Sequence, residues 1–496
     1  MKLTERIKHG LSDHAVRLRS INWFVLVLLG AVVSWMIVNI VIAMRVPVIP
    51  TLSDEYSYFL NVKAFVEHVW PIAVLDYDGV RSSVSGFSAH GPFYSVAYGA
   101  VPAVFRIEWD QWIVLQNSIM LALAALIAWR LPVTQDRFWR PTAALLVLSA
   151  LVCLGYQTHF MVEPLHILGG VALAYLVTRP LSRNGFLALA CATALLVFVF
   201  SLFRIVWVVG YLAVFVRANS VREILIAGLL SLTLFTTNMA FYSLFFASYP
   251  GGFFDVVTQM LFAGAWFDAA SALHGQFVEN WGQFFRFQTR FDYDVSKILY
   301  IVVLLACGAM ALIEKRRDLL IVFLIYLCVF LLLFTLYNAM SWREHRILTP
   351  FYLLGGLCLL TTRAKGIVPL LVAAQLFAAP TTIRSSLSAF DGYRSAFISS
   401  PEGLTQALQD KERLARLPDR NADGKVAVGI EDEQFSLSSN PLLYALPTSN
   451  IEGRPMVYSI AVQGSLDRRT LDYFLSAEDC ASPDGSSGRY KICPVR

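Results

Sequence analysis

Two adjacent acidic side chains are the first candidates for chemistry in this sequence. Asp54 and Glu55 come just after the first long apolar run. Carboxylates beside a hydrocarbon layer are costly unless they are solvated, paired or used. A carboxylate there can take a proton from a hydroxyl, or hold a metal ion or a sugar hydroxyl. The structural alternative is that Ser53 or Asp54 caps a helix that begins at Glu55, and a cap does not exclude catalysis.

The same loop ends in a second cluster, His90-Gly91-Pro92-Phe93-Tyr94. A Gly-Pro pair sets a sharp turn into the following helix, which places His90 near the membrane face. An imidazole there can contact an anion or a metal ion, although a lone histidine more often makes structural hydrogen bonds. Asp76 and Asp78 in this loop have a D-x-D spacing that can hold a divalent ion, and they leave a metal site open. The sequence shows no zinc-ligand spacing, P-loop or G-x-G-x-x-G turn, so it predicts no nucleotide site.

Further charged residues flank later apolar runs. Glu163 comes directly before a proline and could face a cavity, although a proline in a first helical turn is also a common structural device. Arg204 is a rare cation between two apolar runs and could equally snorkel to the interface. Arg343 and Arg346 carry guanidinium forks that suit a phosphate at the headgroup level. The alternative for these two arginines is pairing with Glu344 or with lipid headgroups.

The composition places these residues in a membrane protein. Of 496 residues, 57% are hydrophobic and 15% are charged, whereas soluble domains average about 45–50% apolar and about 25% charged residues. Because the apolar excess covers most of the chain, it excludes a disordered chain, a coiled coil, a typical soluble enzyme and a protein with a single anchor. The net charge of +5 collects in short turns between apolar runs, which is a topology signal and not a nucleic-acid footprint.

We predict an all-α polytopic membrane protein with about eleven transmembrane helices, since one span needs about 20 mostly apolar residues. The apolar runs lie at residues 22–44, 111–129, 141–159, 164–178, 185–202, 205–216, 223–247, 298–313, 319–339, 350–362 and 366–380. The first run is too long for the apolar core of a signal peptide, so it is read as an uncleaved span. Basic residues precede it and fill alternate turns, which predicts a cytoplasmic N-terminus and, with an odd count, an extracytoplasmic C-terminus.

Three longer regions then fall on the outer side, at residues 45–110, 249–297 and 381–496. Within the first, stretches 56–70 and 92–105 are predicted to be juxtamembrane helices along the outer membrane face. The tail, 381–496, has mixed charge with proline and glycine, which indicates a small extracytoplasmic α/β domain after a transmembrane domain at 1–380.

Two of the seven cysteines lie in the tail, and the other five lie within apolar runs. The five are expected to be inert packing residues. Cys480 and Cys493 suit a disulfide bond in an oxidising compartment, and the alternative is two unpaired thiols.

By their order and their common side, these motifs resemble those of the GT-C superfamily of integral-membrane glycosyltransferases. The resemblance is closest to the branch of the protein O-mannosyltransferases and the lipid A aminoarabinose transferase, and it covers roughly residues 20–380. It rests on an acidic pair in the first outer loop, an [HK]-x-P-x-Y-like segment, an acidic residue with proline and a late R-x-x-L-x-P-like element: Asp54-Glu55, His90 to Tyr94, Glu163-Pro164 and Arg346 to Pro350. Gly91 replaces a second proline of many relatives, His90 replaces a lysine of some, the spacing of the last element is slightly changed, and the tail is short. The branch and the sugar therefore stay open.

The resemblance implies sugar transfer from a polyprenyl-phosphate donor to a hydroxyl acceptor at the outer membrane face, by direct displacement with inversion. Asp54 would be the general base, and Glu55 would position the acceptor or the sugar. Arg343, Arg346 and His90 would bind the donor phosphate and stabilise its charge as it leaves. The other candidates for the substrate cavity are Tyr94, Glu163 and Arg204. No cofactor is certain, and a divalent metal ion stays open.

The expected partners are the lipid-linked donor, membrane lipids and an acceptor that is lipopolysaccharide, another cell-envelope glycan or a protein, with no nucleic acid. A bacterial inner membrane is expected because no eukaryotic retention signal is visible, with an endoplasmic reticulum membrane as the alternative. A lipid-linked glycan transporter or flippase is the main competing class, for which charges within spans and repeat symmetry are expected. An outer-face glycan polymerase or ligase would use a pyrophosphate-linked donor, and the intact pair Asp54-Glu55 speaks against a non-catalytic subunit.

Overall fold

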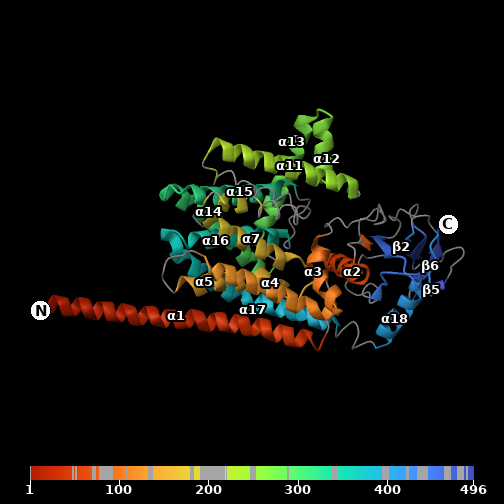
Figure 1. Ribbon diagram of the computed structural model, residues 1–496, viewed down its shortest axis with the longest axis horizontal. Coiled ribbons are helices and arrows are strands. Elements are labelled where there is room, and N and C mark those ends of the chain that lie inside the picture. The colour runs from red at the N-terminus through yellow and green to blue at the C-terminus, as the bar shows by residue number, and fades with distance from the viewer. Residues whose placement is uncertain are drawn as a thin grey trace.

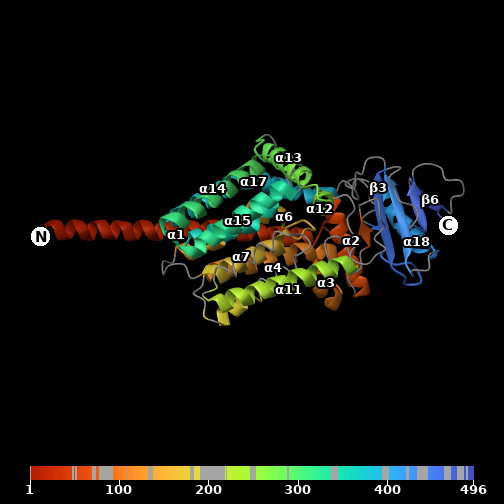
Figure 2. The same ribbon diagram turned by 90° about the horizontal axis from the view of Figure 1, so that it is seen from above.

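The computed structural model consists mainly of a helical bundle with one small sheet at the end opposite the N-terminus (Figure 1). The residues that the structure describes are 2–46, 48, 50, 53–69, 74–76, 93–107, 109–131, 138–178, 182, 184–189, 191, 218, 220–245, 253–287, 290–336, 344–393, 401–420, 424–432, 445–462, 471–476, 485–487 and 490–495. Most of the long helices run along the long axis of the molecule, and α1 (Lys2–Ala43) extends beyond the bundle at its N-terminal end (Figures 1 and 2).

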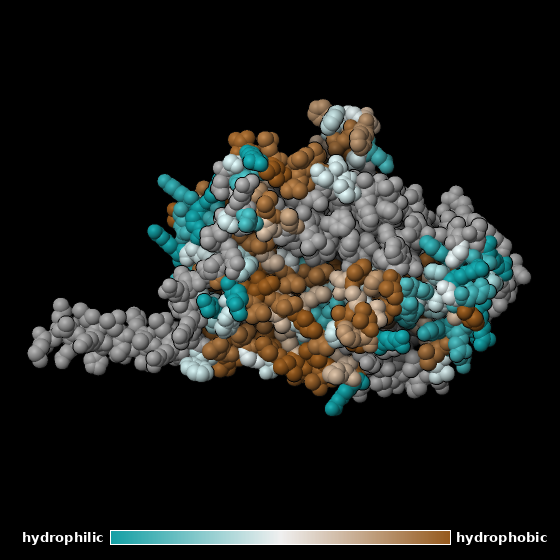
Figure 3. All heavy atoms as spheres, in the orientation of Figure 1, coloured by the Kyte–Doolittle hydropathy of each residue, from teal (hydrophilic) through white to brown (hydrophobic). Residues whose placement is uncertain are grey.

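Five of the described helices are long and apolar enough to cross a membrane, so the chain is a multi-pass membrane protein. The candidate spans are Trp23–Ala43 in α1, Trp112–Trp129 in α4 (Trp109–Trp129), Phe291–Ile313, which is α14, Arg317–Thr335 in α15 (Arg317–Leu336), and Arg363–Leu387, mostly in α17 (Ile367–Tyr393). Hydrophobic side chains cover the bundle on the face drawn in Figure 3, between hydrophilic ones at its two ends.

The predicted count of about eleven is not reached among the described residues. The runs at 185–202 and 205–216 lie mostly outside them, and the run at 223–247 forms α11 (Val221–Phe245). The run at 141–159 is not one span but two short helices, α5 (Trp139–Leu148) and α6 (Leu151–Tyr156). The helix breaks at Ala150, where the backbone is extended with φ −56° and ψ 129°.

Two other predicted spans are short because protein surrounds them. Helix α7 (Glu163–Thr178) has 16 residues and α16 (Thr349–Leu359) has 11, and every residue of α16 is buried. A helix that is enclosed by its neighbours does not need the length that a lipid-facing helix needs. These two helices pack closely, since a Cβ on Gly170 would lie 2.6 Å from the carbonyl oxygen of Pro350.

Three of the basic turns predicted to share one side lie together at one end of the bundle. Arg316 donates from Nη1 to the carbonyl oxygen of Thr361 at 2.7 Å, and the amide of Arg363 donates to Glu314 at 2.7 Å. Lys365 Nζ lies 5.0 Å from the ring centroid of Trp139. The contacts thus join the α14–α15 turn, the α16–α17 turn and the start of α5.

A helical hairpin lies beside the C-terminal end of α15. It consists of α12 (Phe253–Phe262) and α13 (Trp266–Phe284), and in Figure 1 it projects away from the bundle. Asn280 Nδ2 donates to the carbonyl oxygen of Phe334 at 2.8 Å, which fixes the base of the hairpin on α15. The second predicted outer region is therefore helical over much of its length.

The two predicted juxtamembrane stretches form helices, α2 (Ser53–His68) and α3 (Phe93–Phe105). Helix α2 starts at Ser53, two residues before the predicted start. The prediction of a juxtamembrane helix implies that one face of α2 is open. Residues 55–62 are instead all buried. Helix α2 is enclosed between α3, the bundle and the tail (Figure 1).

The polar tail begins later than predicted, because α17 continues past residue 380 to Tyr393. The described residues of the tail form α18 (Pro401–Ala415) and five strands: β2 (Val426–Asp432), β3 (Met456–Val462), β4 (Tyr473–Ser476), β5 (Gly485–Ser487) and β6 (Tyr490–Pro494). The strand order of the sheet is β1-β3-β2-β4-β6-β5. Its edge strand β1 (Leu75–Asp76) comes from the first outer loop and pairs parallel with β3, which the sequence did not predict.

Candidate functional site

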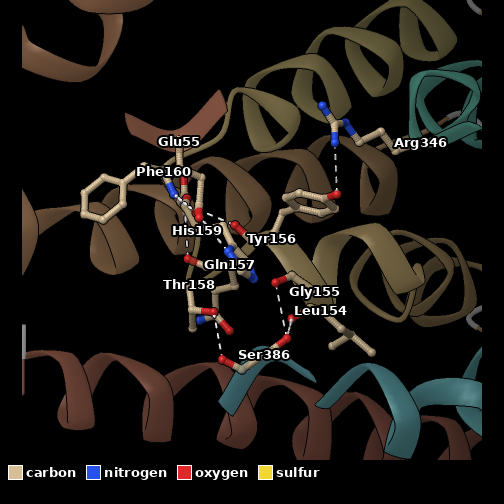
Figure 4. Close-up of polar contacts among 11 residues, drawn as sticks. Glu55, Leu154, Gly155, Tyr156, Gln157, Thr158, His159, Phe160, Arg346 and Ser386 are labelled. Carbon is tan, nitrogen blue, oxygen red and sulfur yellow. Dashed lines mark hydrogen bonds and ion pairs between the residues drawn. The ribbon is translucent and has the colours of Figure 1, made fainter. Parts of the chain in front are cut away.

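Glu55 connects the first outer loop to the connection between α6 and α7. Its side chain is fully buried, and Oε1 accepts hydrogen bonds from His159 Nδ1 at 2.8 Å and from the Phe160 amide at 2.9 Å (Figure 4). Two donors on one oxygen favour a carboxylate over a carboxylic acid. Burial, and then the negative charge of Glu55, raise the pKa of the adjacent Tyr56 above its ordinary value.

Asp54 lies in the first turn of α2, directly before Glu55. Its side chain lies outside the described part of the structure. The backbone position alone brings the acidic pair to the end of the bundle opposite the basic turns (Figure 1).

Arg346 and Glu163 form an ion pair next to the connection between α6 and α7. Arg346 lies in η3 (Glu344–Leu348), before α16, and its Nε is 2.7 Å from Oε1 of Glu163 at the start of α7. Arg346 Nη1 also donates to the Tyr156 hydroxyl at 3.3 Å. Arg346 thus has a carboxylate partner across two helices, and the side chain of Glu344, the partner that the sequence offered, lies outside the described part of the structure.

The connection between α6 and α7 is held by side chains from several helices. Asn117 on α4 donates to the carbonyl oxygens of Tyr156, Gln157 and His159, at 3.3, 3.1 and 3.1 Å. Gln157 bonds to Asn39 of α1 at 2.7 Å. From α17, the hydroxyl of Ser386 donates to the carbonyl oxygen of Leu154 at 3.0 Å (Figure 4). The connection is thus a fixed platform on which Glu55 and Arg346 converge.

A second arginine lies at this end of the bundle. Arg290, just before α14, donates from Nε to Asp292 at 3.0 Å and from Nη1 to the Ser385 hydroxyl at 2.7 Å. Its side chain is 32% exposed. Burial opposes its charge, but the hydrogen bond and charge of Asp292 outweigh burial and raise its pKa, and Tyr156 is close enough to add to this effect. Arg290 is therefore held in place and still accessible.

Asp292 and Asp294, which have the same D-x-D spacing as Asp76 and Asp78, both form ion pairs. Asp292 also accepts from Thr382 at 2.8 Å in addition to its pair with Arg290. Asp294 lies 3.6 Å from Nζ of Lys297. Among the residues that the structure describes, no group of three or more His, Cys, Asp and Glu side chains could hold a metal ion.

The remaining predicted residues fall in several places. Tyr94 is buried on α3, and its ring lies edge-on to Tyr58 of α2 at 4.8 Å. Asp76 lies in β1, opposite Ser459 of β3. Cys493 is disulfide-bonded, and its pairing with Cys480 stays a prediction. The predicted residues outside the described part of the chain are Asp78, His90, Arg204, Arg343 and Cys480.

Three residues of this site were not indicated by the sequence motifs: Tyr156, His159 and Arg290. The first two lay inside a run that was read as a membrane span. The polar stretch Tyr156-Gln157-Thr158-His159 at its end was the available signal, because buried polar side chains in a membrane protein face other protein groups. Arg290 had the same signal as Arg343, a cation on the predicted outer side directly before an apolar run.

No protein-family model matches the sequence, and no curated protein matches it. Among solved structures, the chain is similar to ArnT from Cupriavidus metallidurans in the apo state, with 11% identity, coverage of 86% of this chain and 84% of that one, and a TM-score of 0.41. It is also similar to the oligosaccharyltransferase of Archaeoglobus fulgidus in the apo form, with 11% identity, 85% and 65% coverage, and a TM-score of 0.38. A second structure of that protein, with Zn and sulfate, has 12% identity, 85% and 62% coverage, and a TM-score of 0.39. These likenesses are distant.

Proposed function

We propose that this chain is a GT-C-type glycosyltransferase that moves a sugar from a polyprenyl-phosphate donor to a hydroxyl acceptor at the extracytoplasmic face of a membrane. The observation that supports this proposal is the convergence of Glu55 and Arg346 on one platform between α6 and α7. An acid from the first outer loop and an arginine before a late helix are far apart in sequence. Both bond to residues 156–163, and this supports a site in which the acidic pair and an arginine lie at one end of the bundle.

In the proposed reaction Asp54 takes the proton of the acceptor hydroxyl. The hydroxyl oxygen forms the new bond to the anomeric carbon as the bond from that carbon to the phosphate oxygen breaks. The electron pair of that bond leaves with the lipid phosphate. Direct attack inverts the anomeric centre.

The burial of Glu55 supports a positioning role for this side chain. A fully buried carboxylate that already accepts two hydrogen bonds is suited to hold the first turn of α2. We therefore propose that Glu55 positions Asp54 instead of contacting the sugar. A carboxylate must be aimed closely at the proton it removes, so this support matters for the rate.

The phosphate of the donor needs cations that it can reach. Arg290 is partly exposed, with a planar fork that suits phosphate. Arg346 is nearly buried beside Glu163, so we propose that it shapes the phosphate side of the cavity together with that acid. Arg343 and His90 remain proposed donor contacts, and Tyr94 and Arg204 remain proposed cavity residues. The natural setting proposed is a bacterial inner membrane, with the N-terminus in the cytoplasm and the tail outside.

The test is sugar transfer by the purified full chain in liposomes, with a panel of polyprenyl-phosphate sugars and with lipopolysaccharide, glycan and protein acceptors. Wild type should turn over one donor, and Asp54→Asn should abolish transfer while the protein still binds that donor. Asp268→Asn is the matched control, since it removes an exposed acid in the first turn of α13, outside the proposed site. Near-normal transfer by Asp54→Asn would show that another group is the base. Movement of a lipid-linked glycan across the bilayer, without transfer, would instead identify the transporter.

A further inference from the structure

Helix α2, which carries Asp54 and Glu55, is attached at its two ends to different parts of the chain. Near its start, Glu55 bonds to His159 and Phe160 of the bundle. At its last residue, His68 Nε2 lies 3.3 Å from the carbonyl oxygen of Thr448 in the tail. The helix therefore bridges the transmembrane bundle and the tail domain.

Asn61 adds another link between α2 and the segment that leads to the tail sheet. It is buried on α2, and its Oδ1 accepts from the Val74 amide at 2.7 Å. Its Nδ2 donates to the hydroxyl of Ser57, one turn closer to Glu55, at 3.2 Å. A buried side-chain amide with both ends bonded fixes the backbone it contacts.

Val74 connects Asn61 to the tail sheet. Its carbonyl oxygen accepts from the Tyr458 amide of β3 at 2.6 Å. The next two residues form β1, with Leu75 opposite Tyr458 and Asp76 opposite Ser459. A hydrogen-bonded path therefore runs from the first turns of α2 through Asn61 and β1 into the sheet.

We propose that the tail domain positions the acidic pair: by holding α2 through Asn61 and β1, it keeps Asp54 aimed into the site. The inference rests on the proposed function of Asp54 and Glu55, and it gives the tail a task within the reaction. Asn61 is a positioning residue, since it acts through α2. Strand β1, from the loop beside the site, covers the edge of β3. This pairing joins the helical bundle to the tail domain.

The experiment compares Asn61→Leu with Asn61→Asp in the full chain in liposomes. The leucine removes both hydrogen bonds, whereas the aspartate keeps the acceptor for the Val74 amide. His68→Leu is a milder second variant, because it removes only the contact with Thr448. Gln406→Leu is the matched control, since that amide bonds to Asp410 within α18, at 2.9 Å, and does not belong to the path.

Two readouts are measured, amide hydrogen exchange and steady-state transfer of a donor that the wild type accepts. Asn61→Leu should speed exchange of residues 74–76 and 53–60 by about tenfold to a hundredfold, the range expected for one buried hydrogen-bonding group. It should lower kcat by a similar factor and leave the KM for the donor unchanged. Asn61→Asp should restore most of both, His68→Leu should shift both less, and Gln406→Leu should match wild type.

The proposal is overturned if exchange of 74–76 rises while kcat stays at the wild-type value, because the tail would then be detached without effect. It is also overturned if Asn61→Leu and His68→Leu both leave exchange of 53–60 unchanged. If wild type transfers no sugar, the proposed function fails, and the exchange of 53–60 alone still decides whether the tail holds α2. If Asn61→Leu does not fold, the comparison of Asn61→Asp and His68→Leu with Gln406→Leu decides in the same way.

Discussion

Arg346 and Glu163 form an ion pair between η3 and α7, with Nε 2.7 Å from Oε1 and side chains that are 4% and 5% exposed. Just beyond this pair, α7 and α16 pack with Gly170 against Pro350. The two charges are therefore fixed by helix packing as well as by their attraction. A donor phosphate that approached Arg346 would meet a cation whose field is partly balanced by Glu163.

Removing one member of this pair should lower the free energy of unfolding more than removing both members does. Arg346→Met leaves Glu163 buried without its cation, and we expect the free energy of unfolding to fall by about 3–5 kcal/mol. The double variant Arg346→Met with Glu163→Gln should recover a large part of that loss. The coupling energy comes from thermal unfolding in detergent of four proteins: wild type, Arg346→Met, Glu163→Gln and the double variant. Strictly additive effects would show that the pair is not coupled.

The close approach of α7 and α16 predicts that Gly170 cannot be enlarged. In Gly170→Ala the new methyl would lie 2.6 Å from the Pro350 carbonyl oxygen and 2.8 Å from its Cα, so backbone has to move. We expect a loss of about 1–3 kcal/mol, visible as a lower Tm. The control is Gly282→Ala on α13, where nothing lies within 4 Å and the Tm should stay or rise. Equal Tm values for the two variants would contradict this packing.

Arg290 predicts a donor-binding effect. Arg290→Ala should raise the KM for the polyprenyl-phosphate sugar by about tenfold to a hundredfold, the range for one hydrogen bond to a charged group. Arg290→Lys should recover only part, because an ammonium lacks the fork. Arg286→Ala removes another exposed cation shortly before Arg290 and serves as the control. A rise in KM of the same size in both variants would point to general surface charge, not to a defined phosphate contact.

Tyr458 predicts a loss of stability at alkaline pH. Its hydroxyl donates to the Pro447 carbonyl oxygen at 2.7 Å, and burial, followed by the charge of Glu67, raises its pKa well above 10. The folded protein keeps this proton and the unfolded chain releases it above about pH 10. Stability from this group is thus complete below that pH and declines as the pH rises further.

The measurement is thermal unfolding of wild type and Tyr458→Phe across this range. Tyr458→Phe should cost about 1 kcal/mol near neutral pH, from the lost hydrogen bond. Its Tm should then fall less steeply than that of wild type above about pH 10. Parallel alkaline declines in the two proteins would assign the effect to other groups.

Local sequence patterns predicted the apolar helices and the charged turns, because both depend on residues that are near neighbours in the chain. The runs that became α14 and α15 needed only length and hydropathy. The break at Ala150 was not visible, because a side chain of α17 helps to stabilise it through Ser149 and Gln375. The enclosure of α16 was not visible either, since it depends on which helices surround it.

At the site, residue types were informative and partners were not. Glu55 was found from its chemistry, but its burial and its bond to His159 depend on two segments that meet only after folding. The same holds for β1, which is two residues long and has no signal of its own before β3 lies beside it.

The parallel pairing of β1 with β3 has a consequence for biogenesis. Leu75 leaves the ribosome long before its partner Tyr458, and the chain is made from its N-terminus. Under the proposed topology, β1 waits at the membrane surface until the tail has been translocated and folded. We therefore expect the chain to mature only at the end of its synthesis, and under the proposed function this would keep nascent, partly inserted chains from consuming lipid-linked sugar.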